Sequence, residues 1–288
     1  MTASAMSAAS RSMRIAHLGG SGTWRIDYPA DLNDEGVRLV SEASTDTPYG
    51  LTAPLRFMTV DGVEVLHVRV HGYRGGFTAE PRSRLRDQAA LFWSFRELGV
   101  RQILVDATVG SLNRLLDPGD IVVPDDYVDL RTTRENFAIE LLGEGETLRM
   151  DEPFDSDLRA ILVRAASERF PRVFPRGVSV CTEGPRLETA AEVKLYQAWG
   201  GDIVGQSVGA EIEFARAIRA RYAVCNLVSN YGEGLVPWPT SAAEEMWQKS
   251  GTAMGQTMIT AIRELLNRTP GQKAPIQSEG QHSKAPIT

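Results

Sequence analysis

Strand and helix patterns alternate through CTEGPRLETAAEV (181–193), GGDIVGQSVGAEIEFAR (200–216) and AVCNLVSNYGEG (223–234). Apolar runs in this stretch end in a glycine or a short polar turn, which is typical of elements that pack in layers. The order places four polar side chains at element ends that face one cleft: Glu188, Gln206, Ser207 and Asn230. An acid, an amide and a hydroxyl above a glycine-rich floor favour a flat polar heterocycle that carries a sugar and an anion. The stretch therefore indicates nucleoside chemistry.

The same alternation extends through most of the chain. Runs typical of strands occupy residues 13–20, 63–72, 101–110, 120–128, 177–184, 202–209 and 222–230. Helical spacing of apolar residues occurs at 83–99, 155–170, 187–200, 210–221 and 241–268. Several strand runs are continuous in Val, Ile and Leu, as expected of strands covered on both faces. The pattern predicts an α/β fold, a single domain with a mixed central β-sheet flanked by helices, and ligands at the carboxyl ends of its strands.

Composition limits the classes of protein to which the chain can belong. Its 288 residues, 42% hydrophobic and 24% charged, suffice for one globular domain. The formal charge of -6 and the lack of a Lys/Arg run argue against nucleic acid as a partner. No apolar run has the length of a membrane span, and no secretory signal is evident, so we expect a cytoplasmic protein without a membrane partner. Cys181 and Cys225 lack metal-ligand spacing, so we expect buried reduced thiols and no metal site.

The two ends of the chain differ in composition from the rest. Residues up to Ser12 are small and polar, and the segment from Asn267 onward is rich in Pro, Gln, Ser and Lys. Such segments cannot bury enough apolar surface to offset the entropy of ordering. We therefore expect residues 1–12 and 268–288 to be disordered and residues 13–267 to form the domain.

Three predicted strand ends carry residues suited to an anion. The turn GGSG (19–22) offers backbone amides and the hydroxyl of Ser21, although a simple tight turn uses similar residues. Arg69 and His71 point to the same side of a second strand end, where they either grip a phosphate or form a solvated edge. At the third strand end the amide of Thr108 can cap an oxyanion, unless these small residues only form a turn.

These motifs resemble, in their order, those of trimeric purine nucleoside phosphorylases and methylthioadenosine phosphorylases. The similarity covers residues 14–262 and includes GGSG (19–22), RVHGY (69–73), DATVGSLN (106–113), PGDIVVPDDYVD (118–129), EGPRLETAAEV (183–193), DIVGQS (202–207) and the strand ending in Ser229 and Asn230. The resemblance implies an enzyme that cleaves the N-glycosidic bond of a purine nucleoside with inorganic phosphate, giving free base and a pentose 1-phosphate. It also implies a homotrimer with phosphate as co-substrate and with no metal or other cofactor.

The resemblance also implies a role for each matching residue. Phosphate would be held by Ser21, Arg69, His71, the amide of Thr108 and Ser207. The pentose would lie near Tyr73 and the backbone of Gln206, and the base among Leu187, Glu188 and Asn230. Asn230 would act catalytically, with Glu188 and His71, by meeting N7 of the departing purine. Phosphate beneath the pentose would stabilise the positive charge that develops there and would act as the nucleophile.

Base preference follows from donors and acceptors. A 6-oxopurine presents the acceptor O6 and the donor N1–H, which an Asn amide and a Glu carboxylate complement, whereas a 6-aminopurine presents the reverse. The pair Glu188 and Asn230 therefore favours hypoxanthine or guanine, unless Glu188 is merely a charge at a helix N-terminus. Methylthioadenosine phosphorylases usually have Asp at the places of Asn230 and Gly232. The RTT segment (131–133) and the chain length nevertheless resemble that branch, so methylthioadenosine or adenosine phosphorolysis stays an alternative.

Two departures from the family pattern concern the pentose. Ala243 stands near the start of the last helix, where phosphorylases that recognise a 5′-hydroxyl commonly carry His. A small apolar residue there indicates a 5′-deoxy or 5′-methylthio sugar. Gln206 replaces the usual methionine beneath the pentose. These departures leave two alternatives open, a phosphate-independent nucleosidase and a non-catalytic nucleoside-binding protein, although the intact set of phosphate residues argues against both.

Overall fold

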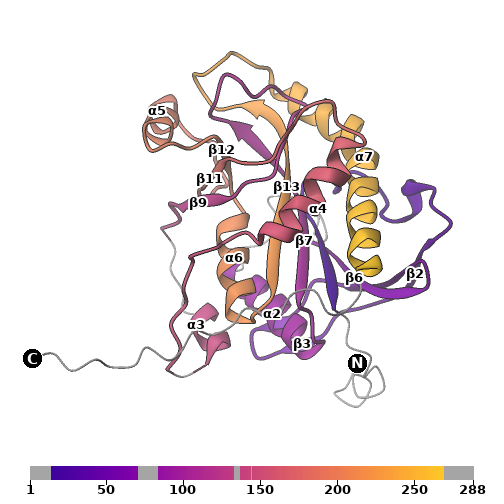
Figure 1. Cartoon of the computed structure of the whole chain (residues 1–288). Coiled ribbons are helices and arrows are strands. Elements are labelled where there is room, and N and C mark those ends of the chain that lie inside the picture. Colours follow the sequence, from indigo (N-terminus) through magenta and orange to yellow (C-terminus); the bar gives the residue numbers. More distant parts are fainter. Residues whose placement is uncertain (1–13, 71–83, 133–136, 144, 269–288) are drawn as a thin grey trace, which may run out of the picture.

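The computed structural model describes residues 14–70, 84–132, 137–143 and 145–268, and its centre is a mixed β-sheet (Figure 1). The predicted disordered ends lie outside these ranges apart from Arg268. Neighbouring strands are, in order, β10 (Val173–Phe174), β8 (Ile121–Val122), β13 (Arg221–Tyr231), β7 (Gln102–Ser111), β1 (Ile15–Gly19), β6 (Val63–Arg69), β5 (Leu55–Val60) and β2 (Val37–Ala43). A branch leaves β7 through β12 (Ile203–Gly205), which pairs with β11 (Val178–Cys181) and through it with β9 (Asp126–Asp129).

Four parallel strands, β13, β7, β1 and β6, form the core of the sheet, and helices cover both of its faces. One hydrophobic cluster contains α2 (Arg84–Glu97), α3 (Phe137–Leu142) and α6 (Val208–Ala217). The other cluster contains α4 (Ser156–Ser167) and the long α7 (Thr240–Asn267). Because successive side chains of a strand point to opposite faces, these two clusters lie on the two sides of the sheet. The predicted α/β architecture is confirmed.

Some elements differ from the prediction. The prediction of one strand over 120–128 is wrong, because β8 pairs with β13 whereas β9 pairs with β11. Pro124, which has no amide hydrogen to donate to a ladder, lies between them. Elements that were not predicted are β2, β5, β10, α3, η1 (Ala30–Leu32), β3 (Asp46–Thr47) and β4 (Gly50–Leu51). Most side chains of the edge strand β2 are exposed, so no apolar alternation marks it in the sequence.

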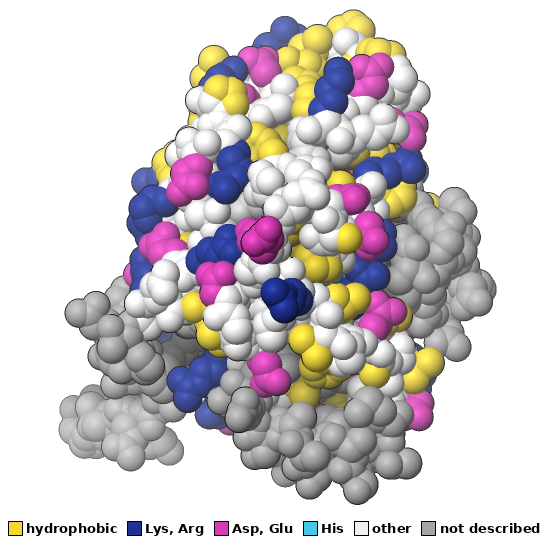
Figure 2. All heavy atoms as spheres, turned by 90° about the vertical axis from the view of Figure 1, so that its right-hand side faces the viewer, with side chains coloured by type: hydrophobic (Ala, Val, Ile, Leu, Met, Phe, Trp, Pro, Cys, Tyr) yellow, Lys and Arg dark blue, Asp and Glu magenta, His cyan; other side chains and the backbone are white. Residues whose placement is uncertain are grey.

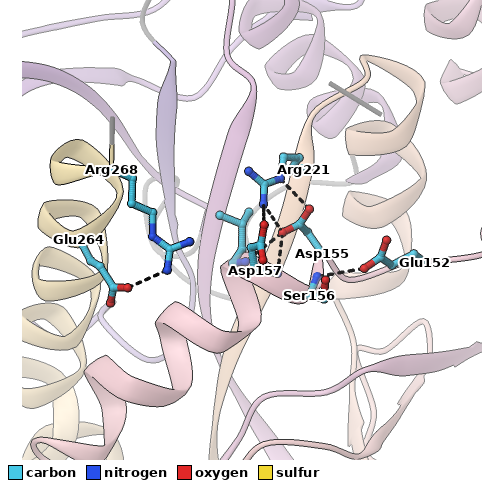
Figure 3. A network of polar contacts seen from close by, with 8 residues as sticks. Glu152, Asp155, Ser156, Asp157, Arg221, Glu264 and Arg268 are labelled. Carbon is cyan, nitrogen blue, oxygen red and sulfur yellow. Dashed lines mark hydrogen bonds and ion pairs between the residues drawn. The ribbon is translucent and has the colours of Figure 1, made fainter. Parts of the chain in front are cut away.

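An ion-pair network fastens the start of β13 to the start of α4 (Figure 3). Asp155 caps α4, and its Oδ1 accepts hydrogen bonds from the amides of Asp157 and Leu158 at 3.0 and 2.9 Å. Arg221, the first residue of β13, donates to both carboxylate oxygens of Asp155 at 2.6 Å. Asn230 lies near the other end of the same strand. The network therefore holds β13 at the end of the strand that is distant from the predicted site.

The face of the molecule drawn in Figure 2 carries charges of both signs. On the face drawn in Figure 2, Lys and Arg side chains are interspersed with Asp and Glu, and no continuous basic area forms on that face. Among the helices that the structure describes, none combines the length and the apolar character needed to cross a bilayer.

The cysteines behave as the sequence predicts. Cys181 and Cys225 are both buried and free, which confirms the expectation of buried reduced thiols. Burial raises the pKa of the Cys181 thiol to about 12. A thiol with this pKa stays protonated at neutral pH, so Cys181 is unsuited to act as a nucleophile.

Candidate functional site

A cavity lies where β7, β12 and β13 end, and it gathers residues from distant parts of the chain. Its wall contains seven of the predicted site residues: Ser21, Thr108, Leu187, Glu188, Gln206, Ser207 and Asn230. The cavity volume is about 170 Å³. Since roughly 10–15 Å³ of such space holds one water molecule, the cavity can hold an organic ligand and not only a small anion.

Two hydroxyl groups of the wall are suited to an anion. Ser207 is the N-cap residue of α6, but its side chain makes no capping hydrogen bond, so its hydroxyl is available to a ligand. The N-terminus of α6 adds a partial positive charge at the same place. Ser21 is 6% exposed, and its Oγ accepts hydrogen bonds from the amide and the hydroxyl of Thr108, both at 2.8 Å. The Thr108 amide, which the resemblance assigns to phosphate, is thus directed at Ser21 in this structure.

The turn that carries Ser21 depends on glycine. A Cβ atom at Gly20 would lie 2.1 Å from the backbone carbonyl oxygen of Asp106 on β7, so a side chain cannot be accommodated without moving backbone. This close approach lets the turn after β1 reach β7. The glycines of GGSG therefore bring the hydroxyl of Ser21 to Thr108 and into the cavity wall.

A buried polar cluster lies behind this turn. Oδ2 of Asp106 is 2.9 Å from Nε2 of His17 and accepts a hydrogen bond from Oγ1 of Thr23 at 2.8 Å. Nδ1 of His67 is 3.1 Å from Nδ1 of His17. The cluster ties the residue after the turn to β1, β6 and β7, which fixes the position of Ser21. The described part of the chain contains no group of three or more His, Cys, Asp or Glu arranged to hold a metal ion.

His67 should make stability fall on mild acidification. Burial, followed by the neighbouring His17, lowers the pKa of His67 well below its ordinary value of 6.5. Below about pH 6.5 the unfolded chain binds a proton at His67 that the folded protein does not, so the free energy of unfolding decreases by up to about 1.4 kcal/mol per pH unit. Urea unfolding at several pH values between 7.5 and 5 measures this slope. His67→Phe, which keeps a ring against Tyr28, should flatten it, and equal slopes would contradict the assignment.

Asn230 is oriented by its chain neighbours. A shift of register between Val228 and Asn230 marks a β-bulge in β13 beside β7. Ser229 Oγ donates to Oδ1 of Asn230 at 2.8 Å, and Nδ2 of Asn230 donates to the carbonyl oxygen of Tyr231 at 3.0 Å. An amide nitrogen carries two hydrogens, so the second remains available to the cavity. Asn230 therefore presents a donor, as a 6-oxopurine requires.

Glu188 is held in a similar way. Its side chain lies on the loop before α5 (Ala190–Ala198) and the residue is 8% exposed. Oγ1 of Thr182 donates to Oε1 of Glu188 at 2.7 Å. One carboxylate oxygen is thus occupied, and the other can accept from a ligand. The capping of α5 is performed by Thr189 and Glu192, so the N-terminus of α5 does not depend on Glu188.

The remaining predicted residues of this region differ in their exposure and in their contact with the cavity. Nε2 of Gln206 donates to the carbonyl oxygen of Arg186 at 2.9 Å, which links the end of β12 to the loop that carries Leu187 and Glu188. Gly184, with φ of +66°, leaves room for Gln206, because a Cβ there would meet Oε1 at 2.1 Å. Leu187 is 48% exposed at the cavity wall. Ala243 is buried on α7 and is not among the cavity-lining residues.

Arg69 lies beside the site rather than in its wall. It is the last residue of β6 and pairs in register with Gly19 at the start of the GGSG turn. Nη2 donates to the carbonyl oxygen of Trp24 at 2.9 Å, and the buried Nε has no hydrogen-bond partner among the described residues. His71 and Tyr73, predicted to bind phosphate and pentose, lie outside the described residues.

Sequence reasoning missed several cavity residues, of which Trp247 is the most informative. Its Nε1 donates to Oγ1 of Thr108 at 3.1 Å, so α7 contributes a side chain to the wall. The signal was present, because Trp247 lies one helical turn after Ala243 and therefore on the same face of α7. Pro185, Ser229, Tyr231 and Glu233 also line the cavity.

Comparisons with known proteins show the family to which the chain belongs. A family model described as Phosphorylase superfamily matches residues 15–266. The chain is 36% identical over 234 residues to a probable 6-oxopurine nucleoside phosphorylase of Dictyoglomus turgidum, covering 81% of this chain and 83% of the relative. It is 32% identical over 255 residues to a probable S-methyl-5′-thioinosine phosphorylase of Methanothermobacter thermautotrophicus, covering 87% and 84%. The crystal structure of a methylthioadenosine phosphorylase sourced from an antarctic soil metagenomic library is similar with a TM-score of 0.76 and 25% identity, covering 90% of this chain and 88% of that one.

Proposed function

Because the chain belongs to the Phosphorylase superfamily, we propose that it cleaves a purine nucleoside with inorganic phosphate, releasing the base and a pentose 1-phosphate. The enzyme is then a pentosyltransferase, and a 6-oxopurine is its favoured base. The observation that carries the proposal is the presence of Ser21, Ser207, Glu188 and Asn230 in the wall of one cavity. Hydroxyl donors suit phosphate, whereas a carboxylate and an amide suit the edge of a 6-oxopurine.

Charge development explains why the reaction needs both groups. As phosphate attacks C1′ and the bond to N9 breaks, positive charge grows on the pentose and negative charge on the purine. Phosphate held by Ser21, Ser207 and the N-terminus of α6 stabilises the first charge and supplies the nucleophile. The free hydrogen of the Asn230 amide stabilises the second, and Glu188 orients the ring by accepting from N1–H.

The other predicted residues complete the proposed site. Arg69 and His71 add cationic or donor groups for phosphate, and Tyr73 and Gln206 flank the pentose. The reaction needs inorganic phosphate as co-substrate and no further cofactor.

A 5′-methylthio sugar is a second candidate at the same site. Ala243, which the resemblance places near the 5′ position, is buried behind the cavity-lining residues and offers no side-chain donor for a 5′-hydroxyl. The Methanothermobacter relative is named for S-methyl-5′-thioinosine, in which such a sugar is joined to a 6-oxopurine. The proposed substrates are therefore inosine, guanosine and S-methyl-5′-thioinosine.

Assembly and location are further parts of the proposal. A homotrimer is supported by the resemblance to trimeric phosphorylases and by exposed apolar side chains on and around α5, namely Leu187, Leu195 and Trp199. A cytoplasmic location accords with the two reduced cysteines. Light scattering coupled to size-exclusion chromatography measures the mass of the assembly.

The proposed function is tested by base release. Inosine, guanosine, adenosine and their 5′-methylthio forms are each incubated with the protein, with and without inorganic phosphate. We expect free hypoxanthine or guanine together with a pentose 1-phosphate, and release only when phosphate is present. Equal release without phosphate would identify a nucleosidase instead. Binding of nucleosides without any release would identify a non-catalytic protein.

A further inference from the structure

A chain of three side chains, which we call the indole relay, connects α7 to the turn after β1. Nε1 of Trp247 donates to Oγ1 of Thr108 at 3.1 Å. Oγ1 of Thr108 in turn donates to Oγ of Ser21 at 2.8 Å. All three residues line the cavity. The relay therefore ends at one of the hydroxyl groups that the proposed function assigns to phosphate.

The direction of the relay follows from the chemistry of its first member. An indole N–H can donate a hydrogen bond but cannot accept one, whereas a hydroxyl has one hydrogen and two lone pairs. Since Oγ1 of Thr108 accepts from Trp247, its own hydrogen is directed to Ser21. An accepted hydrogen bond polarises a hydroxyl and strengthens it as a donor, so the indole N–H favours this order of donation over the reverse.

The backbone amide of Thr108 also contacts the hydroxyl of Ser21. The Thr108 amide also donates to Oγ of Ser21, at 2.8 Å. Oγ of Ser21 therefore accepts two hydrogen bonds, which uses both of its lone pairs. Its own hydrogen is left to donate, and the residue faces the cavity. A hydroxyl in this state attracts an acceptor such as a phosphate oxygen and offers no lone pair to repel it.

We propose that Trp247 is a positioning residue that, through Thr108, favours the hydroxyl of Ser21 as a hydrogen-bond donor to phosphate. The inference rests on the proposed function for the identity of the anion. Trp247 acts on phosphate indirectly, through the direction of two hydroxyl groups. Without the indole N–H, the Thr108 hydroxyl is a weaker donor and more readily accepts from Ser21, which then turns a lone pair toward the anion.

The surroundings of Trp247 favour a fixed orientation of the indole. Its ring contacts that of Trp24 edge to face, with centroids 5.7 Å apart. Trp24 lies on the same segment as Ser21, three residues later. Ala243, one turn earlier on α7, is buried. The packing of α7 against this segment thus sets both ends of the relay.

The test compares phosphate affinity in variants that keep or remove the relay. Trp247→Phe retains an aromatic ring but removes the N–H, and Thr108→Val removes the hydroxyl with little change of shape. Isothermal titration with inorganic phosphate should give about tenfold weaker binding in each, the loss expected for one hydrogen bond to a charged group. In turnover assays KM for phosphate should rise by a similar factor, with a smaller change in KM for the nucleoside.

A double variant separates the relay from simple packing. Because both substitutions interrupt the same relay, Trp247→Phe should add almost nothing in the Thr108→Val background. Thr108→Ser keeps the hydroxyl and should recover most of the phosphate affinity that Thr108→Val loses. Trp24→Phe removes an indole N–H from the neighbouring ring and serves as the matched control. Additive losses, or an equal loss in Trp24→Phe, would overturn the relay.

Binding and turnover together distinguish the two proposals. If the wild-type protein releases base but Trp247→Phe binds phosphate normally, the relay is wrong and the proposed function stands. If the wild-type protein binds phosphate without releasing base from the nucleosides tested, the proposed function is wrong, and the titrations still decide the relay. Absence of phosphate binding by the wild-type protein would overturn both.

Discussion

Replacing Asn230 with Asp is expected to shift the preference of the enzyme from 6-oxopurine to 6-aminopurine nucleosides. In the native site, Ser229 holds Oδ1 of Asn230, so the amide nitrogen faces the ligand as a donor. In Asn230→Asp an acceptor replaces that donor and meets O6 of hypoxanthine, which is itself an acceptor. An unpaired or repelled polar group in such a site costs about 1–3 kcal/mol, which corresponds to about 5–150-fold in kcat/KM. The kcat/KM for adenosine should rise, because the 6-amino group of adenine donates a hydrogen bond to the new carboxylate.

The measurement is the ratio of kcat/KM for inosine to that for adenosine, at saturating phosphate. Ser229→Ala is the matched control, because it keeps the Asn230 amide and removes only the hydroxyl that orients it. We expect Ser229→Ala to weaken discrimination without favouring adenosine. An unchanged ratio in Asn230→Asp would show that Asn230 does not read the 6-position.

The sheet and its helices were predictable because their apolar patterns are local. The runs that became β1, β6, β7 and β13 are mostly buried and rich in apolar residues. The edge strand β2 escaped prediction because partners on one side and solvent on the other leave it without a regular pattern. The division of 120–128 into β8 and β9 depends on pairing with strands distant in sequence, which no local pattern encodes.

The polar residues of the cavity were predictable from strand ends, but their partners were not. Ser207 and Glu188 follow strands and Asn230 lies near the end of one, and the carboxyl ends of these strands meet at the cavity. The bulge that sets Asn230 beside Ser229 is a property of the β13 and β7 register. Trp247 reaches Thr108 across 139 residues of sequence, because α7 packs against β7 and β13. Contacts of this kind follow from tertiary packing rather than from residue spacing.

Glu188→Gln is expected to impair the same 6-oxopurine nucleosides through the other edge atom. Thr182 donates to one oxygen of Glu188, so the oxygen of Gln should occupy that position and its NH2 group should face the base. A donor then opposes N1–H of hypoxanthine, whereas N1 of adenine accepts. Since residue 188 is 8% exposed, water cannot readily relieve the mismatch. We expect kcat/KM for inosine to fall about 10–100-fold, and that for adenosine to be maintained or raised.

The orientation of the side chain at position 188 can be tested by replacing Thr182. In Glu188→Gln/Thr182→Val no hydroxyl fixes the amide, which can turn its oxygen toward N1–H, so part of the inosine activity should return. Thr182→Val alone should leave base preference unchanged, because either oxygen of a carboxylate accepts equally well. If Glu188 were only a charge near the start of α5, Glu188→Gln would alter thermal stability and leave the ratio of inosine to adenosine turnover as it was. The capping of α5 by Thr189 and Glu192 argues against that alternative, since the helix already has its N-terminal partners.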